Sequence, residues 1–317
     1  MQGTTLLELN RIADRYWKDS ALNGLLRACF IRKAEEKSIW GELTTTVHRM
    51  FRGDHPNIAT IAAISELLLL ALDVADDLQD EDNPEVPWMQ CPRPYALNAV
   101  LALIFGAVGE LDRCSQRTEA HNETTPHIHL ETVSALIADA IRGQQTDLMN
   151  EIQTEEQYIE MIRLKSGSLV KLACYLGYRS AGVADPGVTD RIDELAVSIG
   201  MYSQIRNDAR DIVRWDQKND LLKKKKTLPV LFLLADTEDT FSPFRLYYEG
   251  QLTLDQLLAL KQDCMTYIEQ SGCIEYCKII QSLYRNRAHE LIDELEADSE
   301  WKARFRALTI VQPPLLL

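Results

Sequence analysis

Apolar side chains recur every three to four residues along most of the chain, which is the spacing of an amphipathic α-helix. This period extends over residues 57–80, 95–113, 126–150, 155–178, 188–214, 227–236, 253–271 and 274–298. Helix breakers are scarce, because the chain has only 14 glycines and 11 prolines. We therefore predict an all-α protein.

The breaks between these segments coincide with residues that end or start helices. Four prolines predict a loop over residues 83–94, Thr125-Pro126 predicts a helix start, and Gly182–Gly187 contains a turn. The sequence has no linker rich in Ser, Gly or Pro and no repeat. We predict a single helical domain over residues 1–317.

Composition and charge narrow the classes of partner. The chain has 317 residues, of which 46% are hydrophobic and 26% charged, and its formal net charge is −14. This balance provides a large core and argues against a nucleic-acid partner. The longest apolar run, residues 67–72, is far shorter than the ~20 residues of a membrane span. We therefore predict no transmembrane segment.

The compartment is predicted from the N-terminus and the cysteines. Glu8 and Asp14 interrupt any apolar signal-peptide region, and the seven cysteines include no CxxC pair. Both features favour reduced thiols in the cytosol. We predict a cytoplasmic protein, with a peripheral position at the membrane left open.

An acidic cluster directly follows the apolar run. Asp73, Asp76, Asp77 and Asp80 fall within an arc of about 100° on one helix face. Like charges at these spacings repel one another, so a solvated acidic helix end is one interpretation. The preceding run belongs to the core, however, which places the carboxylates at the mouth of a buried cavity. Buried carboxylates need a counter-charge, and oxygen ligands favour Mg²⁺.

A second oxygen-rich helix follows about 130 residues later. Gln204, Asn207, Asp208 and Asp211 share one side of it, and Lys218 and the lysines of 223–226 come next. A lysine run alone is usually a solvated surface. Together with two acidic helices and an apolar wall, it fits a diphosphate that Mg²⁺ bridges to the protein, with a hydrocarbon tail in the cavity.

These motifs resemble those of the class I trans-isoprenyl diphosphate synthases, and most closely those of the competence-pheromone isoprenyltransferases. The resemblance covers roughly residues 45–235. Asp76-Asp77-Leu78-Gln79-Asp80 is similar to the first motif, DDxxD, and Glu66 lies ahead of it where the family has an acid. The other similar elements, in chain order, are Gly143-Gln144-Gln145-Thr146-Asp147-Leu148 (GQxxDL), Lys165-Ser166 (Lys-Thr), Gln204 to Asp211 (QIxDDxxD), Lys218, and Lys225 to Pro229. Five elements in the correct order make the probability of chance agreement very small.

The resemblance implies an isoprenoid-synthase helical bundle with a central apolar cavity, and it implies site roles. The implied Mg²⁺ ligands are Asp73, Asp76, Asp80, Asn207, Asp208 and Asp211. The implied catalytic residues are Asp76, Asp80, Lys165, Asp208 and Asp211. The implied substrate-binding residues are Asp77, Gln144, Asp147, Lys165, Ser166, Gln204, Lys218, Lys225, Arg49, Arg52, Ala71 and Leu72. Of these, Ala71 and Leu72 would permit a tail longer than geranyl.

Two departures concern the acceptor. The synthases bind isopentenyl diphosphate through a Gly-Lys-Arg ahead of DDxxD and an arginine pair after it. Here we expect the first place at residues 52–56, Arg-Gly-Asp-His-Pro, and the second at 81–86, Glu-Asp-Asn-Pro-Glu-Val. These acidic replacements repel a phosphate, so we expect another acceptor, with Arg49 and Arg52 lining its site. Asn207, in place of an aspartate, supplies an oxygen ligand without charge.

The resemblance therefore implies a Mg²⁺-dependent transfer of a geranyl or farnesyl group from its diphosphate to a tryptophan of a peptide pheromone precursor. Two alternatives stay open at this point. One is a chain-elongating prenyl diphosphate synthase that uses isopentenyl diphosphate, and the other is a catalytically silent regulatory subunit. A homodimer is expected from the resemblance only.

Overall fold

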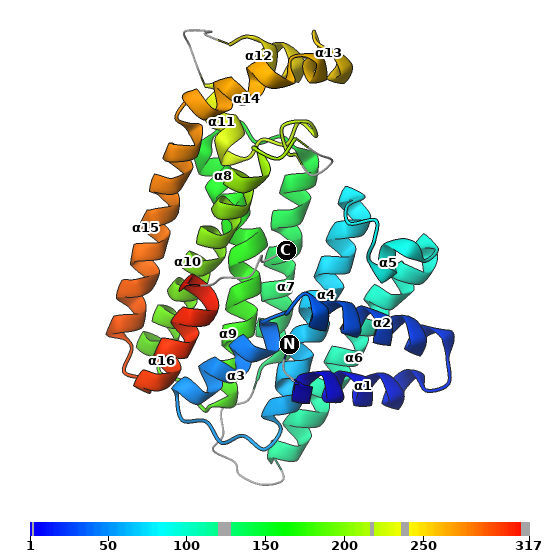
Figure 1. The fold of residues 1–317 in the computed structure, drawn as a ribbon. Helices are drawn as coiled ribbons and strands as arrows, with labels where there is room; N and C mark the ends of the chain where they lie inside the picture. The colour runs from blue at the N-terminus through cyan, green and yellow to red at the C-terminus, as the bar shows by residue number, and fades with distance from the viewer. Residues whose placement is uncertain (2, 120–127, 216–218, 236–240, 312–317) are drawn as a thin grey trace.

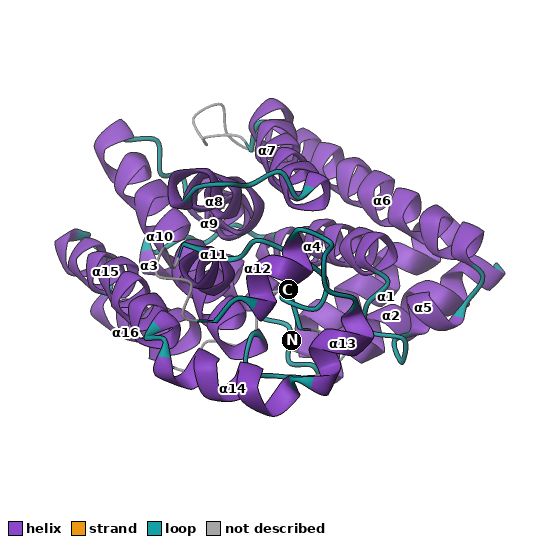
Figure 2. Cartoon of the chain, turned by 90° about the horizontal axis from the view of Figure 1, so that it is seen from above, coloured by secondary structure: helices purple, strands orange, loops and turns teal. Residues whose placement is uncertain are grey.

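The computed structural model describes residues 1, 3–119, 128–215, 219–235 and 241–311, and within these ranges every regular element is a helix (Figures 1 and 2). The first half contains α1 (Gly3–Trp17), α2 (Ala21–Glu35), α3 (Trp40–Met50), α4 (Ile58–Asp80), α5 (Pro87–Gln90), α6 (Arg93–Glu119) and α7 (Leu130–Met149). The second half contains α8 (Glu155–Ile162), the π-helix η1 (Arg163–Gly167), α9 (Ser168–Ser180), α10 (Pro186–Asp211), α11 (Leu228–Leu234), α12 (Pro243–Tyr248), α13 (Leu254–Ala259), α14 (Lys261–Gln270), α15 (Cys273–Glu294), α16 (Ser299–Arg306) and the π-helix η2 (Ala307–Val311). The predicted all-α class is confirmed.

Helix α4 is the central element of the bundle. Residues 60–71 are buried on every side of the helix, as expected for a helix that is apolar all round. It packs against α1, α3, α6 and α9, and Figure 2 shows it in the interior of the bundle. By length and composition α4 and residues 93–115 of α6 could each cross a membrane, but 72% of the α4 window is buried inside the fold. Helix α4 is therefore a core helix.

Several boundaries differ from the predicted segments. The predicted segment 155–178 is divided into α8, η1 and α9, and 253–271 into α13 and α14. Helix α10 begins at Pro186 because Asp185 caps it by accepting a hydrogen bond from the backbone N–H of Val188, at 3.0 Å. The short α5 lies inside the predicted loop. The predicted helix start at Thr125-Pro126 lies outside the described residues.

The N-terminal helices α1–α3 were not predicted. The periodicity did not predict α2 because the apolar residues of this helix surround its axis instead of forming one stripe. Its start is fixed by Ser20, whose hydroxyl accepts a hydrogen bond from the backbone N–H of Asn23. All seven cysteines are free, and six of them are buried.

Candidate functional site

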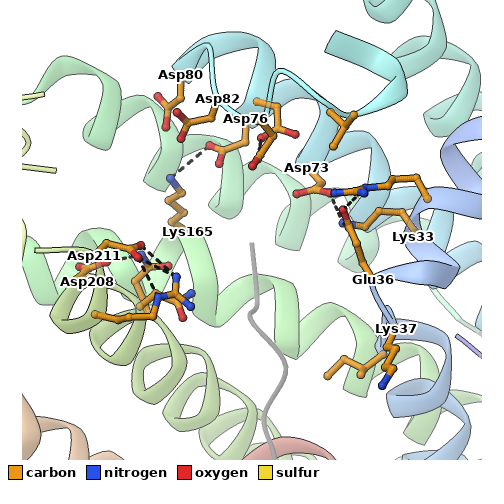
Figure 3. Close-up of a pocket in the computed structure, with 18 of the residues that line it drawn as sticks. Lys33, Glu36, Lys37, Asp73, Asp76, Asp80, Asp82, Lys165, Asp208 and Asp211 are labelled. Carbon is orange, nitrogen blue, oxygen red and sulfur yellow. Dashed lines mark hydrogen bonds and ion pairs between the residues drawn. The ribbon is translucent and has the colours of Figure 1, made fainter. Parts of the chain in front are cut away.

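The acidic end of α4 forms one wall of a cavity of about 1070 Å³ (Figure 3). All four predicted aspartates of this helix line the cavity. Three of them contact lysines: Asp73 contacts Lys33 at 2.6 Å, Asp76 contacts Lys165 at 3.3 Å and Asp80 contacts Lys225 at 2.6 Å. The repulsion that the spacing predicts is thus balanced by cations from three other segments.

Asp77 has a different role from its neighbours. Its two carboxylate oxygens accept hydrogen bonds from Asn83 Nδ2, at 2.5 Å, and from Trp88 Nε1, at 2.7 Å. Burial, reinforced by the charge of Asp73, raises the pKa of Asp77 to about 7. Because both oxygens are used inside the protein, Asp77 anchors the loop after α4, and this loop forms part of the cavity wall.

Lys165 reaches the cavity from the π-helix η1, which is packed tightly between two helices. A Cβ at Gly143 of α7 would lie 2.3 Å from the backbone N of Lys165, and one at Gly200 of α10 would lie 2.6 Å from the carbonyl oxygen of Ser166. Only glycine permits this approach, which explains why the GQxxDL motif begins with one. A π-helical turn at such a place is typical of functional sites.

The Lys165 ammonium group links Asp76 of α4 to Asp147 of α7. Its Nζ donates to Asp147 Oδ2 at 2.9 Å and lies 3.3 Å from Asp76 Oδ1. Burial alone would lower the pKa of Lys165, but Asp76 and Asp147 outweigh burial and hold its pKa above the ordinary value. Lys225 repeats this arrangement, since its Nζ donates to Asp80 at 2.6 Å and to Asp147 at 3.4 Å. Both lysines are therefore charged and fixed in position.

Helix α10 forms the opposite wall of the cavity, where Figure 3 shows Asp208 and Asp211 facing the α4 carboxylates. Asp208 accepts hydrogen bonds from Tyr158 Oη at 2.6 Å and from Gln204 Nε2 at 2.8 Å. Ser166 in turn donates to Gln204 Oε1 at 2.7 Å. Burial raises the pKa of Asp208 to about 6 in spite of these hydrogen bonds. The chain of bonds orients Asp208 from η1 and α8.

Three further side chains with oxygen atoms complete this wall. Asp211 contacts Arg210 at 2.9 Å and Arg214 at 3.6 Å, and the buried Asn207 also lines the cavity. Asp220, in the segment after α10, lines it as well, and burial raises its pKa to about 8. The predicted Lys218 lies outside the described residues.

Other predicted residues do not line this cavity. Gln144 donates to Gln79 at 3.1 Å beside it. Ala71 is fully buried and Leu72 half-buried in the large core. Their effect on tail length stays a prediction.

Arg49 and Arg52, which we expected to line the acceptor site, lie outside this cavity wall. Arg49 donates to the carbonyl oxygen of Gly53 at 3.0 Å, and neither arginine lines the cavity. The reason is the direction of α3: Glu42, near its start, lines the cavity, whereas Arg49 lies seven residues further along, about 10 Å at 1.5 Å per residue. The cations on this side come instead from α2 and α16: Arg32, Lys33, Lys37 and Arg304.

These cations are site residues that the sequence reasoning missed. A cluster of three basic residues within 32–37 was visible, but charged residues on a helix are usually solvated, so the cluster alone indicated nothing. The acidic loop 81–86 does lie at the cavity, through Asp82, Asn83, Glu85 and Val86.

Comparisons with known proteins agree with this arrangement. The polyprenyl synthetase family pattern matches residues 31–251. The chain is 37% identical over 239 residues to a tryptophan prenyltransferase ComQ of Bacillus spizizenii, covering 75% of this chain and 81% of that protein. This protein belongs to the polyprenyl synthetase family. As a member, it is a prenyltransferase.

Other members are similar over comparable lengths. A tryptophan prenyltransferase ComQ of Bacillus subtilis (strain 168) is 27% identical over 277 residues, which is 85% of this chain and 86% of that protein. A solved geranylgeranyl pyrophosphate synthase of Corynebacterium glutamicum, in complex with calcium and isoprenyl diphosphate, has a TM-score of 0.74 at 23% identity and covers 96% of this chain and 92% of that one. This structural likeness shows that the fold is shared.

The donor set of this family member suits a hard divalent cation. The side chains that face one another from α4 and α10 offer carboxylate and amide oxygens, which Mg²⁺ prefers. Among the described residues, no three acidic, histidine or cysteine side chains lie close enough together to hold a metal by themselves. Mg²⁺ is typically held by one or two carboxylates and by substrate phosphates rather than by a protein cage, so the residues fit a cation that binds with a diphosphate.

Proposed function

We propose that the protein transfers a geranyl or farnesyl group from its diphosphate to the indole of a tryptophan in a peptide pheromone precursor. The single observation that carries the proposal is the cavity in which α4 and α10 oppose their carboxylates, with Lys165 and Lys225 between them. The 37% identity to a tryptophan prenyltransferase supports the choice of acceptor. We include Mg²⁺ as cofactor, held by Asp76, Asp80, Asn207, Asp208 and Asp211.

The residues suit ionisation of an allylic diphosphate. When bound, Mg²⁺ supplies positive charge to the diphosphate oxygens as the allylic C–O bond breaks. Lys165 and Lys225 add two ammonium groups, which Asp76, Asp80 and Asp147 hold in position. The electron pair of the broken bond moves to the leaving diphosphate. Positive groups fixed in place before reaction stabilise that charge more than they stabilise the intact substrate.

The second half of the reaction needs no nucleophile from the enzyme. The allylic carbon bonds to a carbon of the electron-rich indole, and the overall reaction releases diphosphate and a proton. The enzyme's part is to orient the indole against the allylic carbon and to keep water out. The loop after α4, anchored by Asp77 and Trp88, is placed to form this acceptor wall.

One observation favours chain elongation as a second candidate. Arg32, Lys33, Lys37 and Arg304 line the acceptor side of the cavity, where a phosphate-bearing acceptor would need cations.

An acceptor assay separates the candidates. Purified protein is incubated with Mg²⁺, geranyl or farnesyl diphosphate, and either isopentenyl diphosphate or a tryptophan-containing peptide, and products are followed by mass spectrometry. We expect a prenylated peptide. A longer polyprenyl diphosphate without a prenylated peptide would support elongation, and no diphosphate release with either acceptor would support a silent regulatory subunit.

Matched variants locate the activity in the cavity. Asp76→Asn removes one proposed ligand charge and should lower turnover by at least about 100-fold. Asp263→Asn removes an exposed carboxylate of α14 and should leave turnover unchanged. Equal effects of the two variants would reject the proposed site.

We further propose a homodimer and a cytoplasmic location, with a peripheral position at the membrane left open. Leu97, Leu101 and Phe105 form an exposed apolar row on α6, which supports a covered face. Sedimentation velocity tests the dimer, which a monomer would contradict, and the same measurement with vesicles tests the peripheral position.

A further inference from the structure

The turn between α2 and α3 places a lysine where a glycine is usual. Lys37 has φ 60°. Its N–H bonds to the carbonyl of Ala34, at 3.1 Å, and the N–H of Ser38 bonds to the carbonyl of Lys33, at 2.9 Å. This is the Schellman motif, and its left-handed position is occupied mostly by glycine because a Cβ is unfavourable there. Backbone strain of this kind occurs at active sites, and Lys37 is one of seven described non-glycine residues with a positive φ.

The turn is fixed to α4 through a buried carboxylate. Ser38 Oγ donates to Glu66 Oε2 at 2.6 Å, and the backbone N–H of Gly41 donates to Glu66 Oε1 at 2.9 Å. Only 2% of Glu66 is exposed. Because Glu66 belongs to the same helix as the aspartates of the cavity, the base of Lys37 is held in a fixed place relative to them.

Lys37 differs from the other cations of this side in having no counter-charge. Lys33 is paired with Asp73 and with Glu36, at 2.6 and 2.7 Å. Arg32 contacts Glu36 at 2.7 Å, and Arg304 of α16 contacts Glu42 at 2.6 Å. Lys37 lines the same cavity (Figure 3), yet in the described part of the chain no carboxylate lies within 4.0 Å of its ammonium group.

We propose that Lys37 binds one carboxylate of the acceptor peptide and thereby positions its tryptophan. A diphosphate acceptor carries two to three negative charges, but among the lysine and arginine side chains described on this side of the cavity only Lys37 has no ion pair, since Arg32, Lys33 and Arg304 each contact a carboxylate. One open ammonium group matches one carboxylate. The inference rests on the proposed function and specifies how its acceptor is recognised.

The carboxylate could be the C-terminus of the peptide or an acidic side chain, and three synthetic probes distinguish these sources. The first is a short peptide with one tryptophan, no acidic residue and a free C-terminal carboxylate. The second is the same peptide with a C-terminal amide. The third is amidated and carries one glutamate beside the tryptophan. If Lys37 binds the C-terminal carboxylate, the first peptide has a lower KM than the second. If Lys37 binds an acidic side chain, the third peptide has a lower KM than the second.

Three substitutions of Lys37 test its role. Lys37→Met should raise KM for the carboxylate-bearing peptide about tenfold, leave KM for the prenyl diphosphate unchanged, and retain most of kcat. Lys37→Arg should restore most of the affinity. Lys37→Gly should raise KM equally while the melting temperature stays the same or rises by about 1–3 °C, because glycine suits the left-handed position. A structural role for the side chain would instead lower the melting temperature.

A double-mutant cycle gives the decisive comparison. The tenfold penalty of Lys37→Met should vanish with the neutral peptide, because the carboxylate it would bind is absent. Lys278→Met, at an exposed lysine of α15, should change neither KM. Equal penalties with charged and neutral peptides, or none with either, would overturn the inference while peptide prenylation by the wild-type enzyme would still support the proposed function. Transfer by the wild-type enzyme to isopentenyl diphosphate and to none of the peptides would reject both.

Discussion

His48 provides a test of how α3 is packed against α9. Its side chain is fully buried, and its Nδ1 lies 2.9 Å from Ser180 Oγ. The turn after α3 covers the ring so closely that a Cβ on Gly53 would lie 2.3 Å from it. Burial, reinforced by the charges of Arg49 and His55, lowers the pKa of His48 to about 4. The fold therefore holds the neutral imidazole.

The sign of the pH effect follows from proton linkage. The unfolded chain binds a proton at His48 with a pKa of 6.5, whereas the folded chain binds it only near pH 4. The stabilising contribution is thus complete above about pH 6.5 and is lost as the pH falls toward 4. At 1.36 kcal/mol per pKa unit, the free energy of unfolding falls by about 0.8 kcal/mol at pH 6 and by about 2 kcal/mol at pH 5.

His48→Gln removes the titrating group and leaves a side chain of similar length that can still bond Ser180. We expect the variant to be less stable than wild type at pH 8, and the difference to shrink by those amounts at pH 6 and pH 5. Urea unfolding at the three pH values measures it. Ser180→Ala is the matched control, because it removes the partner hydroxyl and keeps the imidazole, so its difference from wild type should not shrink in this way. A His48→Gln difference that is constant or grows from pH 8 to pH 5 would refute the reasoning.

Three further predictions concern the cavity. Tyr158→Phe removes the hydroxyl that orients Asp208 and should lower kcat/KM about tenfold. Tyr276→Phe removes a similar hydrogen bond to a carboxylate outside the cavity and should leave kcat/KM unchanged. Equal losses in the two variants would argue against an orienting role of Tyr158. Gly143→Ala forces apart two backbones that touch and should cost at least about 3 kcal/mol in urea unfolding, whereas Gly24→Ala, with open space around it in α2, should stabilise by about 0.5–1 kcal/mol; a Gly143→Ala variant as stable as wild type would contradict the close packing. Chelation with EDTA should abolish turnover, Mg²⁺ should restore it, and the helical circular dichroism should stay unchanged; full turnover in EDTA would reject the proposed cofactor.

The charge network gives these predictions a common basis. Among the described residues, every cavity lysine but one is held by a carboxylate from a different segment, as Lys225 is by Asp80 and Lys165 by Asp147. Such pairs fix ammonium groups before a substrate arrives, so the protein need not reorganise when charge develops on a leaving group. Of the cavity lysines that the structure describes, only Lys37 has no carboxylate within 4.0 Å.

Much of the site could be read from local patterns. The 3.6-residue period predicted most of the long helices from α4 onward, and the spacing of Asp73, Asp76 and Asp80 placed them on one face of α4, because both properties depend on neighbours within two helical turns. The ordered motifs also indicated that α4, η1 and α10 contribute to one site. Gly143 in the sequence indicated that another segment approaches this helix closely. The sequence did not indicate that this segment is the backbone of Lys165.

Tertiary structure decided which segments face one another. Arg49 and Arg52 were expected at the acceptor side, but the direction of α3 takes them away from the cavity, and the chain turn after α2 brings Lys37 there instead. The pairing of each aspartate with its lysine, and the use of Asp77 to hold Trp88, likewise join residues from different elements. A sequence pattern fixes the face of a helix on which a side chain lies, whereas its partner depends on how helices distant along the chain pack together, and that packing is a property of the whole core.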